Sequence, residues 1–134
     1  MGDDGVSLVT RAFGLTAESK AARYLKRKGY RILERNVRSS SGELDLVAQV
    51  GDIVVFVEVK ARRTSAYGGA PYAIDAHKQA KLVKLAAQYV VRHGLSNRVC
   101  RFDVILCTED SAGRLAIEHI EQAFDVPGGT GWSV

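Results

Sequence analysis

The feature that most constrains the fold is the segment Ile53–Ala61, IVVFVEVKA, which is almost entirely apolar and β-branched. Such runs are typical of strands covered on both faces by other elements. We therefore predict a central, buried strand here. This strand carries Glu58 and Lys60 within apolar surroundings. Charged side chains are rare in such surroundings unless they are paired with an opposite charge or have a functional role.

The rest of the chain alternates between helical and extended patterns. Apolar spacing predicts helices at about 16–28 and 75–93, with Thr16 as the first N-cap and Gly29 as the first helix end. Extended patterns predict strands at about 31–38, 43–50, 53–61, 98–108 and 115–120. The order α-β-β-β-α-β-β predicts an α/β fold with a central sheet flanked by helices.

Length and composition set broad limits on the function. The 134 residues suit one domain, expected at 12–124, with flexible termini at 1–11 and 125–134. We expect a cytoplasmic protein with no membrane partner, because there is neither a secretory signal nor an apolar run of roughly 20 residues. Cys100 and Cys107 are seven residues apart on one strand, so they should be reduced thiols on opposite faces. The net charge of +4 is compatible with nucleic acid.

The turn before the central strand, Gly51-Asp52, suits a two-residue type II′ hairpin. Counting back from that turn places Asp45 opposite Glu58, and Glu43 opposite Lys60. The alternative two-residue loop, one position earlier, shifts the partners but keeps all four charges on one face. Only an odd-length loop or a bulge would separate Asp45 from Glu58.

Two opposed carboxylates in a partly buried sheet are costly unless something neutralises them. Mg²⁺ would do so, since it takes carboxylate, water and phosphate oxygens. Lys60 could then orient a water or stabilise charge on a phosphodiester. The structural alternative is that Lys60 only neutralises an acid across the sheet.

Four ordered motifs carry a resemblance to a known family: GELDLVA (42–48), VFVEVKAR (55–62), KQAKLVKLAAQY (78–89) and RFDVI (101–105). Together they resemble the bacterial YraN-type family over about residues 12–121. That family is assigned to the restriction-endonuclease-like, PD-(D/E)xK superfamily and is similar to archaeal Holliday junction resolvases. The resemblance implies a restriction-endonuclease-like mixed sheet and a site for Mg²⁺ or Mn²⁺.

Position by position, the resemblance makes Asp45 and Glu58 metal ligands and Lys60 the lysine of the motif. Glu18 takes the place of an acidic residue on the first helix, a further candidate metal ligand and catalytic residue. Its alternative role is to compensate the helix dipole. Two departures are Ala17, where the family usually has glycine, and Ser39–Ser41, where it often has a basic or aromatic residue. The second departure removes an expected phosphate contact.

Three basic residues are candidates for nucleic-acid contact. Arg62 and Arg63 directly follow the motif, and Lys78 begins the second helix. The loop 64–71 could be a cover over the site or a simple connection. We predict a structural pairing role for Asp103, with Arg101 on the same strand face. The three histidines lack metal-ligand spacing and are interpreted as surface or helix-end residues.

The leading functional hypothesis is a Mg²⁺- or Mn²⁺-dependent endonuclease-like protein acting on DNA, including branched or structured DNA. The alternatives are a non-catalytic nucleic-acid-binding module of the same fold and a protein-interaction subunit. A homodimer is compatible with all three hypotheses.

Overall fold

The computed structural model describes residues 11–63, 74–126 and 132–133. The predicted order α-β-β-β-α-β-β is confirmed, with one short strand added at the end. The elements are α1 (Arg11–Arg27), β1 (Arg31–Ser39), β2 (Gly42–Val50), β3 (Ile53–Arg63), α2 (Ala76–Arg92), β4 (Val99–Glu109), β5 (Leu115–Ile120) and β6 (Trp132–Ser133). The loop 64–71 lies outside the described residues, as do most of the expected flexible termini.

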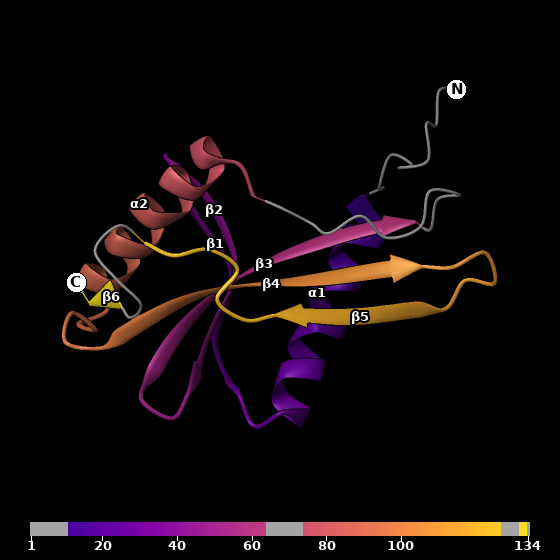
Figure 1. The fold of residues 1–134 in the computed structure, drawn as a ribbon, viewed down its shortest axis with the longest axis horizontal. Coiled ribbons are helices and arrows are strands. Elements are labelled where there is room, and N and C mark those ends of the chain that lie inside the picture. The colour runs from indigo at the N-terminus through magenta and orange to yellow at the C-terminus, as the bar shows by residue number, and fades with distance from the viewer. Residues whose placement is uncertain (1–10, 64–73, 127–131, 134) are drawn as a thin grey trace.

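The strands form one mixed sheet in the order β1-β2-β3-β4-β5, and β6 pairs with the start of β4. Pairing is antiparallel except between β3 and β4, which run parallel and are connected through α2 (Figure 1). A parallel pair needs a crossover of this kind, because a hairpin turn cannot bring the chain back in the same direction. No helix within the described residues is long and apolar enough to cross a membrane.

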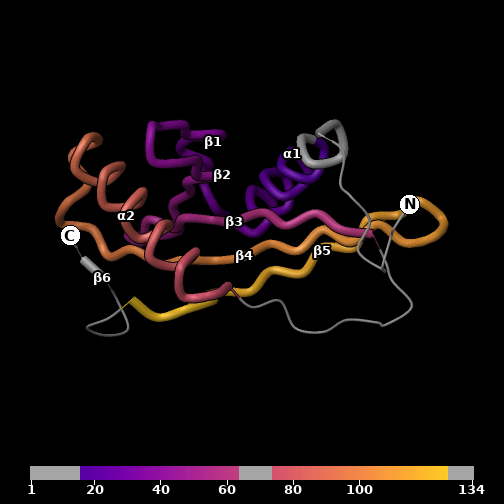
Figure 2. The backbone as a smooth tube through the Cα atoms, turned by 90° about the horizontal axis from the view of Figure 1, so that it is seen from above, coloured from indigo at the N-terminus to yellow at the C-terminus, as the bar shows by residue number. Residues whose placement is uncertain are grey.

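The two helices cover opposite faces of the sheet, as the apolar run in β3 predicts. Both helices lie against the long strands, towards opposite ends of them (Figure 2). Side chains of β3 alternate between two cores: Val55 and Val57 pack with α1, and Val54 and Phe56 pack with α2. The helices contribute Ala17, Ala21, Ala22 and Leu25 to the first core and Leu82, Leu85, Ala86, Tyr89 and Val90 to the second.

The start of α1 differs from the prediction. The helix begins at Arg11, so Thr16 is an interior residue and not the N-cap. Gly14 lies inside the helix, where a glycine costs only about 1 kcal/mol relative to alanine. The predicted helix end is correct, because Gly29 adopts a left-handed φ of 94° directly after the last turn.

The hairpin between β2 and β3 has the predicted register, with Val50 opposite Ile53. The φ of Gly51 is positive, at 56°, and the φ of Asp52 is negative. This combination is the one that a type II′ turn requires. Pairing of the two strands ends at Leu46 opposite Val57. Beyond that point β1 and β2 bend together away from β3 and towards α2 (Figure 1).

Gly42, at the tip of the β1–β2 hairpin, permits this approach to α2. Its φ is 141°, and a Cβ at this position would lie 2.9 Å from Lys81 Cε and 3.3 Å from Leu85 Cδ1. Only glycine combines that backbone conformation with that lack of volume. The bend is accommodated in β1 by a register shift between Ile32 and Glu34.

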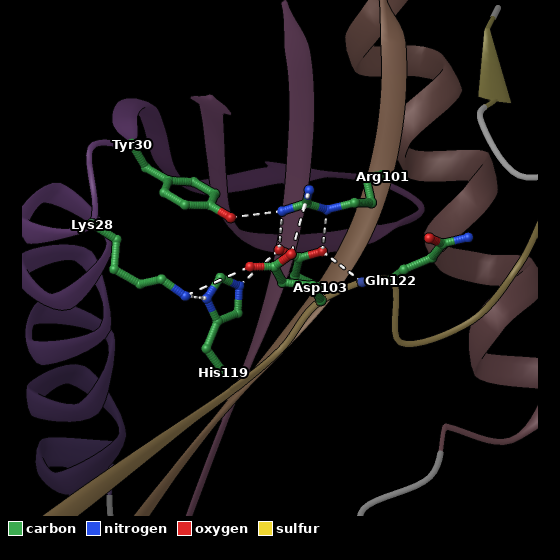
Figure 3. Close-up of polar contacts among 7 residues, drawn as sticks. Lys28, Tyr30, Arg101, Asp103, His119 and Gln122 are labelled. Atoms are coloured by element: carbon green, nitrogen blue, oxygen red, sulfur yellow. Dashed lines mark hydrogen bonds and ion pairs between the residues drawn. The ribbon is translucent and has the colours of Figure 1, made fainter. Parts of the chain in front are cut away.

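A buried carboxylate, Asp103, joins β4 to β5 on the α1 side of the sheet (Figure 3). Arg101 donates to both of its oxygens at 2.8 Å, and the backbone N–H of Gln122 donates at 3.0 Å. His119 Nε2 lies 2.7 Å from Oδ2. Burial alone would raise the pKa of Asp103, but the hydrogen bonds from His119 and Arg101 outweigh it and hold the pKa below its usual value. The predicted pairing of Arg101 with Asp103 is therefore confirmed.

The same cluster reaches the end of α1. Lys28 Nζ lies 2.8 Å from His119 Nδ1, and Arg101 donates to the Tyr30 hydroxyl at 2.7 Å. An ammonium group can only donate, so this contact selects the histidine tautomer with its proton on Nε2, which donates to Asp103. The interpretation of His119 as a surface residue was wrong, since its side chain is 1% exposed. His77 and His93 do lie exposed at the two ends of α2.

Replacing Asp103 by alanine should lower the free energy of unfolding by about 3–5 kcal/mol, because Arg101 and His119 then lose their buried partner. Urea unfolding at neutral pH measures this loss. Asp52→Ala, in the exposed hairpin turn, serves as the control and should cost under about 1 kcal/mol. A loss of the control's size for Asp103→Ala would contradict a structural role for the cluster.

Candidate metal centre at the split between β2 and β3

Asp45 lies at the point where β2 leaves β3. The backbone N–H of Val59 on β3 would have paired with β2 if the ladder had continued. The Asp45 carboxylate accepts this N–H instead, with Oδ2 at 2.8 Å. A side chain thus takes the place of a backbone partner that the split has removed, which avoids an unsatisfied polar group. The carboxylate is held between the strands rather than on one open face.

The surroundings of Asp45 disfavour its negative charge. Burial and the nearby carboxylate of Glu58 raise its pKa from 3.8 to about 7, while the hydrogen bond from Val59 opposes the rise. Glu18 and Glu43 add smaller effects in the same raising direction. Near neutral pH, this position therefore favours either a proton or a neighbouring cation.

Glu58 faces α2, and its side chain is only 13% exposed. Its Oε2 lies 3.4 Å from Nζ of Lys78, in the first turn of α2. Asp75 caps that turn, because its side chain accepts a hydrogen bond from the backbone N–H of Lys78 at 2.8 Å. The cap fixes the position of the Lys78 backbone. Lys78 therefore supplies the positive charge that contacts Glu58.

Lys60 lies two residues beyond Glu58 on β3, so strand alternation puts it on the same face. It is exposed and forms no ion pair with another described residue. The expected pairs, Asp45 opposite Glu58 and Glu43 opposite Lys60, do not form, because the ladder between β2 and β3 ends at Leu46 opposite Val57. Glu43 instead forms an exposed ion pair with Arg38 at 3.4 Å.

Glu18 lies on α1, and its charge reaches Asp45. Its Oε1 is fully buried and has no hydrogen-bond partner among the described residues. Burial and Glu43 raise the pKa of this carboxyl group, and a hydrogen bond with Asn36 opposes the rise. Compensation of the helix dipole does not account for Glu18, because the dipole acts within the first turn and the helix begins at Arg11.

The two arginines that follow the motif lie on different faces. Arg62 shares the face of Lys60 by alternation, and its Nε lies 3.4 Å from the Thr108 hydroxyl of β4. Arg63 points to the other face and forms a 2.8 Å ion pair with Glu109. Of the two, Arg62 lies on the strand face of Glu58 and Lys60.

The donor set suits a hard divalent cation, because all the candidate ligands are carboxylates and one buried oxygen has no partner. Glu58 and Glu18 come from opposite sides of the sheet and both act on Asp45 through charge. In the described part of the chain, however, no three His, Cys, Asp or Glu side chains form a ready metal-binding group. The arrangement is an electrostatic cluster rather than a closed coordination shell.

Sequence reasoning missed two residues that shape this cluster. Asn36 contacts Glu18 from a left-handed backbone conformation, φ 54°, inside β1. Asparagine is enriched in that conformation, so its presence in an extended run was the available signal. The second is Ser19, which accepts a 2.9 Å hydrogen bond from Arg35 and ties α1 to β1. Nothing in the residue pattern pointed to it.

Asp45→Asn should stabilise the metal-free protein at pH 8 by about 1–3 kcal/mol. The folded protein binds a proton at Asp45 more tightly than the unfolded chain does, since its pKa is raised to about 7. This contribution to stability is complete below the unfolded pKa of 3.8 and is lost as the pH rises through about 7. Asparagine cannot ionise, so it avoids that loss.

Urea unfolding with a chelator, at pH 5 and pH 8, measures the effect. The gain over wild type should be larger at pH 8, and the exposed Asp52→Asn control should show no comparable change between the two conditions. An Asp45→Asn variant that is equally destabilised at both pH values would show that the carboxylate is not strained.

Comparison with known proteins assigns the chain to a family. Residues 17–107 match the model of the uncharacterised protein family UPF0102. A UPF0102 protein of Symbiobacterium thermophilum is 46% identical over 116 residues, which cover 87% of this chain and 98% of the relative. A UPF0102 protein of Geobacter sulfurreducens is 43% identical over 116 residues, covering 87% and 91% of the two chains. The chain therefore belongs to the UPF0102 family, which confirms the YraN-type resemblance in its sequence.

Proposed function

We propose that this protein is a metal-dependent endonuclease-like enzyme that hydrolyses phosphodiester bonds in DNA, including branched or structured DNA. We also propose that its fold is of the restriction-endonuclease-like, PD-(D/E)xK type. One observation carries the proposal: Asp45 is held in the split between β2 and β3, beside Glu58 and Glu18, where its negative charge is disfavoured. A structural carboxylate gains nothing from acidic neighbours that disfavour its charge, whereas Mg²⁺ is commonly held by one or two carboxylates together with water and phosphate oxygens.

In this proposal Asp45 and Glu58 hold Mg²⁺ or Mn²⁺, and the unpartnered oxygen of Glu18 is a further ligand. When bound, the cation polarises the phosphate and lowers the pKa of a water molecule. Lys60 is exposed beside Glu58 and has no competing partner in the described chain, so it can orient that water or stabilise charge on the phosphodiester.

Lys78 and Arg62 are the proposed phosphate contacts on this face. Lys78 is 44% exposed and bound to Glu58, so a cation at Glu58 would release its ammonium group towards substrate. Arg62 offers a guanidinium fork of the kind that binds phosphate oxygens in pairs. Arg63 remains a candidate only if it leaves Glu109.

Partners and location follow from the same proposal. DNA fits the net charge of +4 and the basic residues near the carboxylates. A cytoplasmic location fits the free, buried thiols of Cys100 and Cys107, which lie on opposite faces as predicted. A homodimer remains compatible with the proposal.

A second candidate function is a nucleic-acid-binding module without catalysis. The Lys78–Glu58 ion pair favours it, because a permanent lysine at this carboxylate would make a divalent cation unnecessary. That module would bind nucleic acid in a salt-sensitive way. Its binding would survive Lys60→Ala.

A cleavage panel tests the proposal against this alternative. Labelled duplex, forked and four-way DNA, together with RNA, are incubated with Mg²⁺, Mn²⁺ or a chelator. We expect cleavage that depends on the divalent cation and falls at least about 100-fold in Glu58→Ala and in Lys60→Ala. Glu118→Ala and Lys84→Ala, on exposed positions elsewhere, should retain activity. Salt-sensitive binding without cleavage of any substrate would favour the non-catalytic module.

Lys78→Met should tighten the binding of Mn²⁺ by about 2- to 5-fold, because the cation no longer competes with a half-exposed ion pair. Isothermal titration of the variant and wild type measures this change. Lys84→Met, on the exposed side of α2, should leave the affinity unchanged. Weaker binding by Lys78→Met would show that the lysine supports the metal centre rather than competing for it.

A further inference from the structure

A groove of about 820 Å³ runs between α1 and the hairpin formed by β4 and β5. Among the described residues, its charged lining consists of Lys20, Arg23 and Arg27 from α1, with Glu109 and Arg114 from the hairpin. It lies on the opposite flank of α1 from Glu18, whose neighbours belong to β1 and β2. The groove is thus separated from the candidate metal centre by the body of the helix.

Positive charge dominates this groove. Glu109, the one acid among the described residues that line it, is already bound by Arg63 at 2.8 Å. Arg114 pairs with Asp110 at 3.2 Å, yet its side chain remains 81% exposed. The three cations of α1 form no ion pair with any other residue that the structure describes.

The spacing of Lys20, Arg23 and Arg27 places these cations on one stripe of the helix. Like charges three or four residues apart destabilise a helix by a few tenths of a kcal/mol per pair. Among the described residues, the acid in the groove, Glu109, is paired with Arg63 and does not offset this cost. A negatively charged occupant would remove it.

Tyr24 adds an aromatic side chain to the lining of the groove. The ring of Tyr24 packs edge-on against His119, with centroids 6.1 Å apart, and Lys28 Nζ lies 5.4 Å from its centroid. Leu115 and Ile117 of β5 also line the groove and add apolar surface to the cations. Cations together with apolar and aromatic surface match a polymer that presents both phosphates and sugars or bases.

We propose that this groove is a second, sequence-independent binding surface for the phosphate backbone of nucleic acid. The inference rests on the proposed function in that it assumes a nucleic-acid partner. Arg23 and Arg27 would bind phosphate oxygens through their guanidinium groups, and Lys20 would add a mobile charge. A substrate that occupies both places must extend past α1, so the groove would hold a segment other than the one at the carboxylates.

The test measures binding of a short labelled DNA duplex by the full chain across a salt series. It is done with a chelator and in the Glu58→Ala background, so that no cleavage is involved. The groove variant is K20Q/R23Q/R27Q, and the matched control is K26Q/R31Q/K84Q, which removes three exposed charges outside the groove. We expect the groove variant to lose about tenfold or more in affinity. The slope of log affinity against log salt concentration should become shallower by the equivalent of about two to three phosphate contacts.

The control should lose less than about threefold. Equal losses in the two triple variants would overturn the proposal, because net charge alone would then explain binding. Unchanged affinity in the groove variant would overturn it as well. Thermal melts verify that both variants fold, and Arg23→Glu alone should reproduce the loss if the triple variant unfolds.

The outcome is independent of catalysis. A protein that binds DNA through the groove but cleaves nothing would retain this inference and lose the proposed activity. Cleavage that the groove variant does not affect would retain the proposed activity and contradict this inference. An oligo-glutamate peptide that binds as tightly as DNA, with the same dependence on the variant, would assign the groove to an acidic protein partner and overturn the proposal.

Discussion

The hydrogen bond from the Val59 backbone to Asp45 is the interaction on which the candidate centre depends. It terminates the ladder between β2 and β3 without leaving a buried N–H unsatisfied. The β1–β2 hairpin is therefore able to bend onto α2 while β3 continues alongside β4. The same bond fixes a carboxylate in the resulting gap, within electrostatic reach of Glu58 and Glu18. The hydrogen bond between Val59 N and Asp45 Oδ2 therefore both ends the strand pairing and places the carboxylate charge.

Helix α1 is the second organising element, because its two flanks differ in charge. One flank presents Glu18 to the split sheet, and the other presents the cations of the groove. The small residues between them, Ala17 and Ala21, are fully buried and allow the helix to lie close to β3. The helix therefore sits low enough for both flanks to meet strands. The Asp103 cluster holds its C-terminal end through Lys28 and Tyr30.

Much of this was predictable from local pattern. The apolar run in β3 required cover on both faces, and the glycine turn fixed the register as far as Leu46 opposite Val57. Asp45 and Glu58 follow that last pair, and their carboxylates interact through charge. The split was not predictable, because it depends on the approach of Gly42 to Lys81 and Leu85 across a long stretch of sequence. That is why Glu43 does not reach Lys60. A single histidine likewise gives no periodic signal, so the burial of His119 emerged only from the packing of β5 on α1.

The two native thiols have a practical consequence. Cys100 belongs to the core under α2 and Cys107 to the core under α1, and burial raises the pKa of each to about 11. Neither thiol should react quickly with an alkylating reagent in the native state. The modification rate of Cys100 would therefore report on opening of the core under α2, and the rate of Cys107 on opening of the core under α1. A cysteine introduced on the surface could be labelled with a spectroscopic probe while the two native thiols react only slowly.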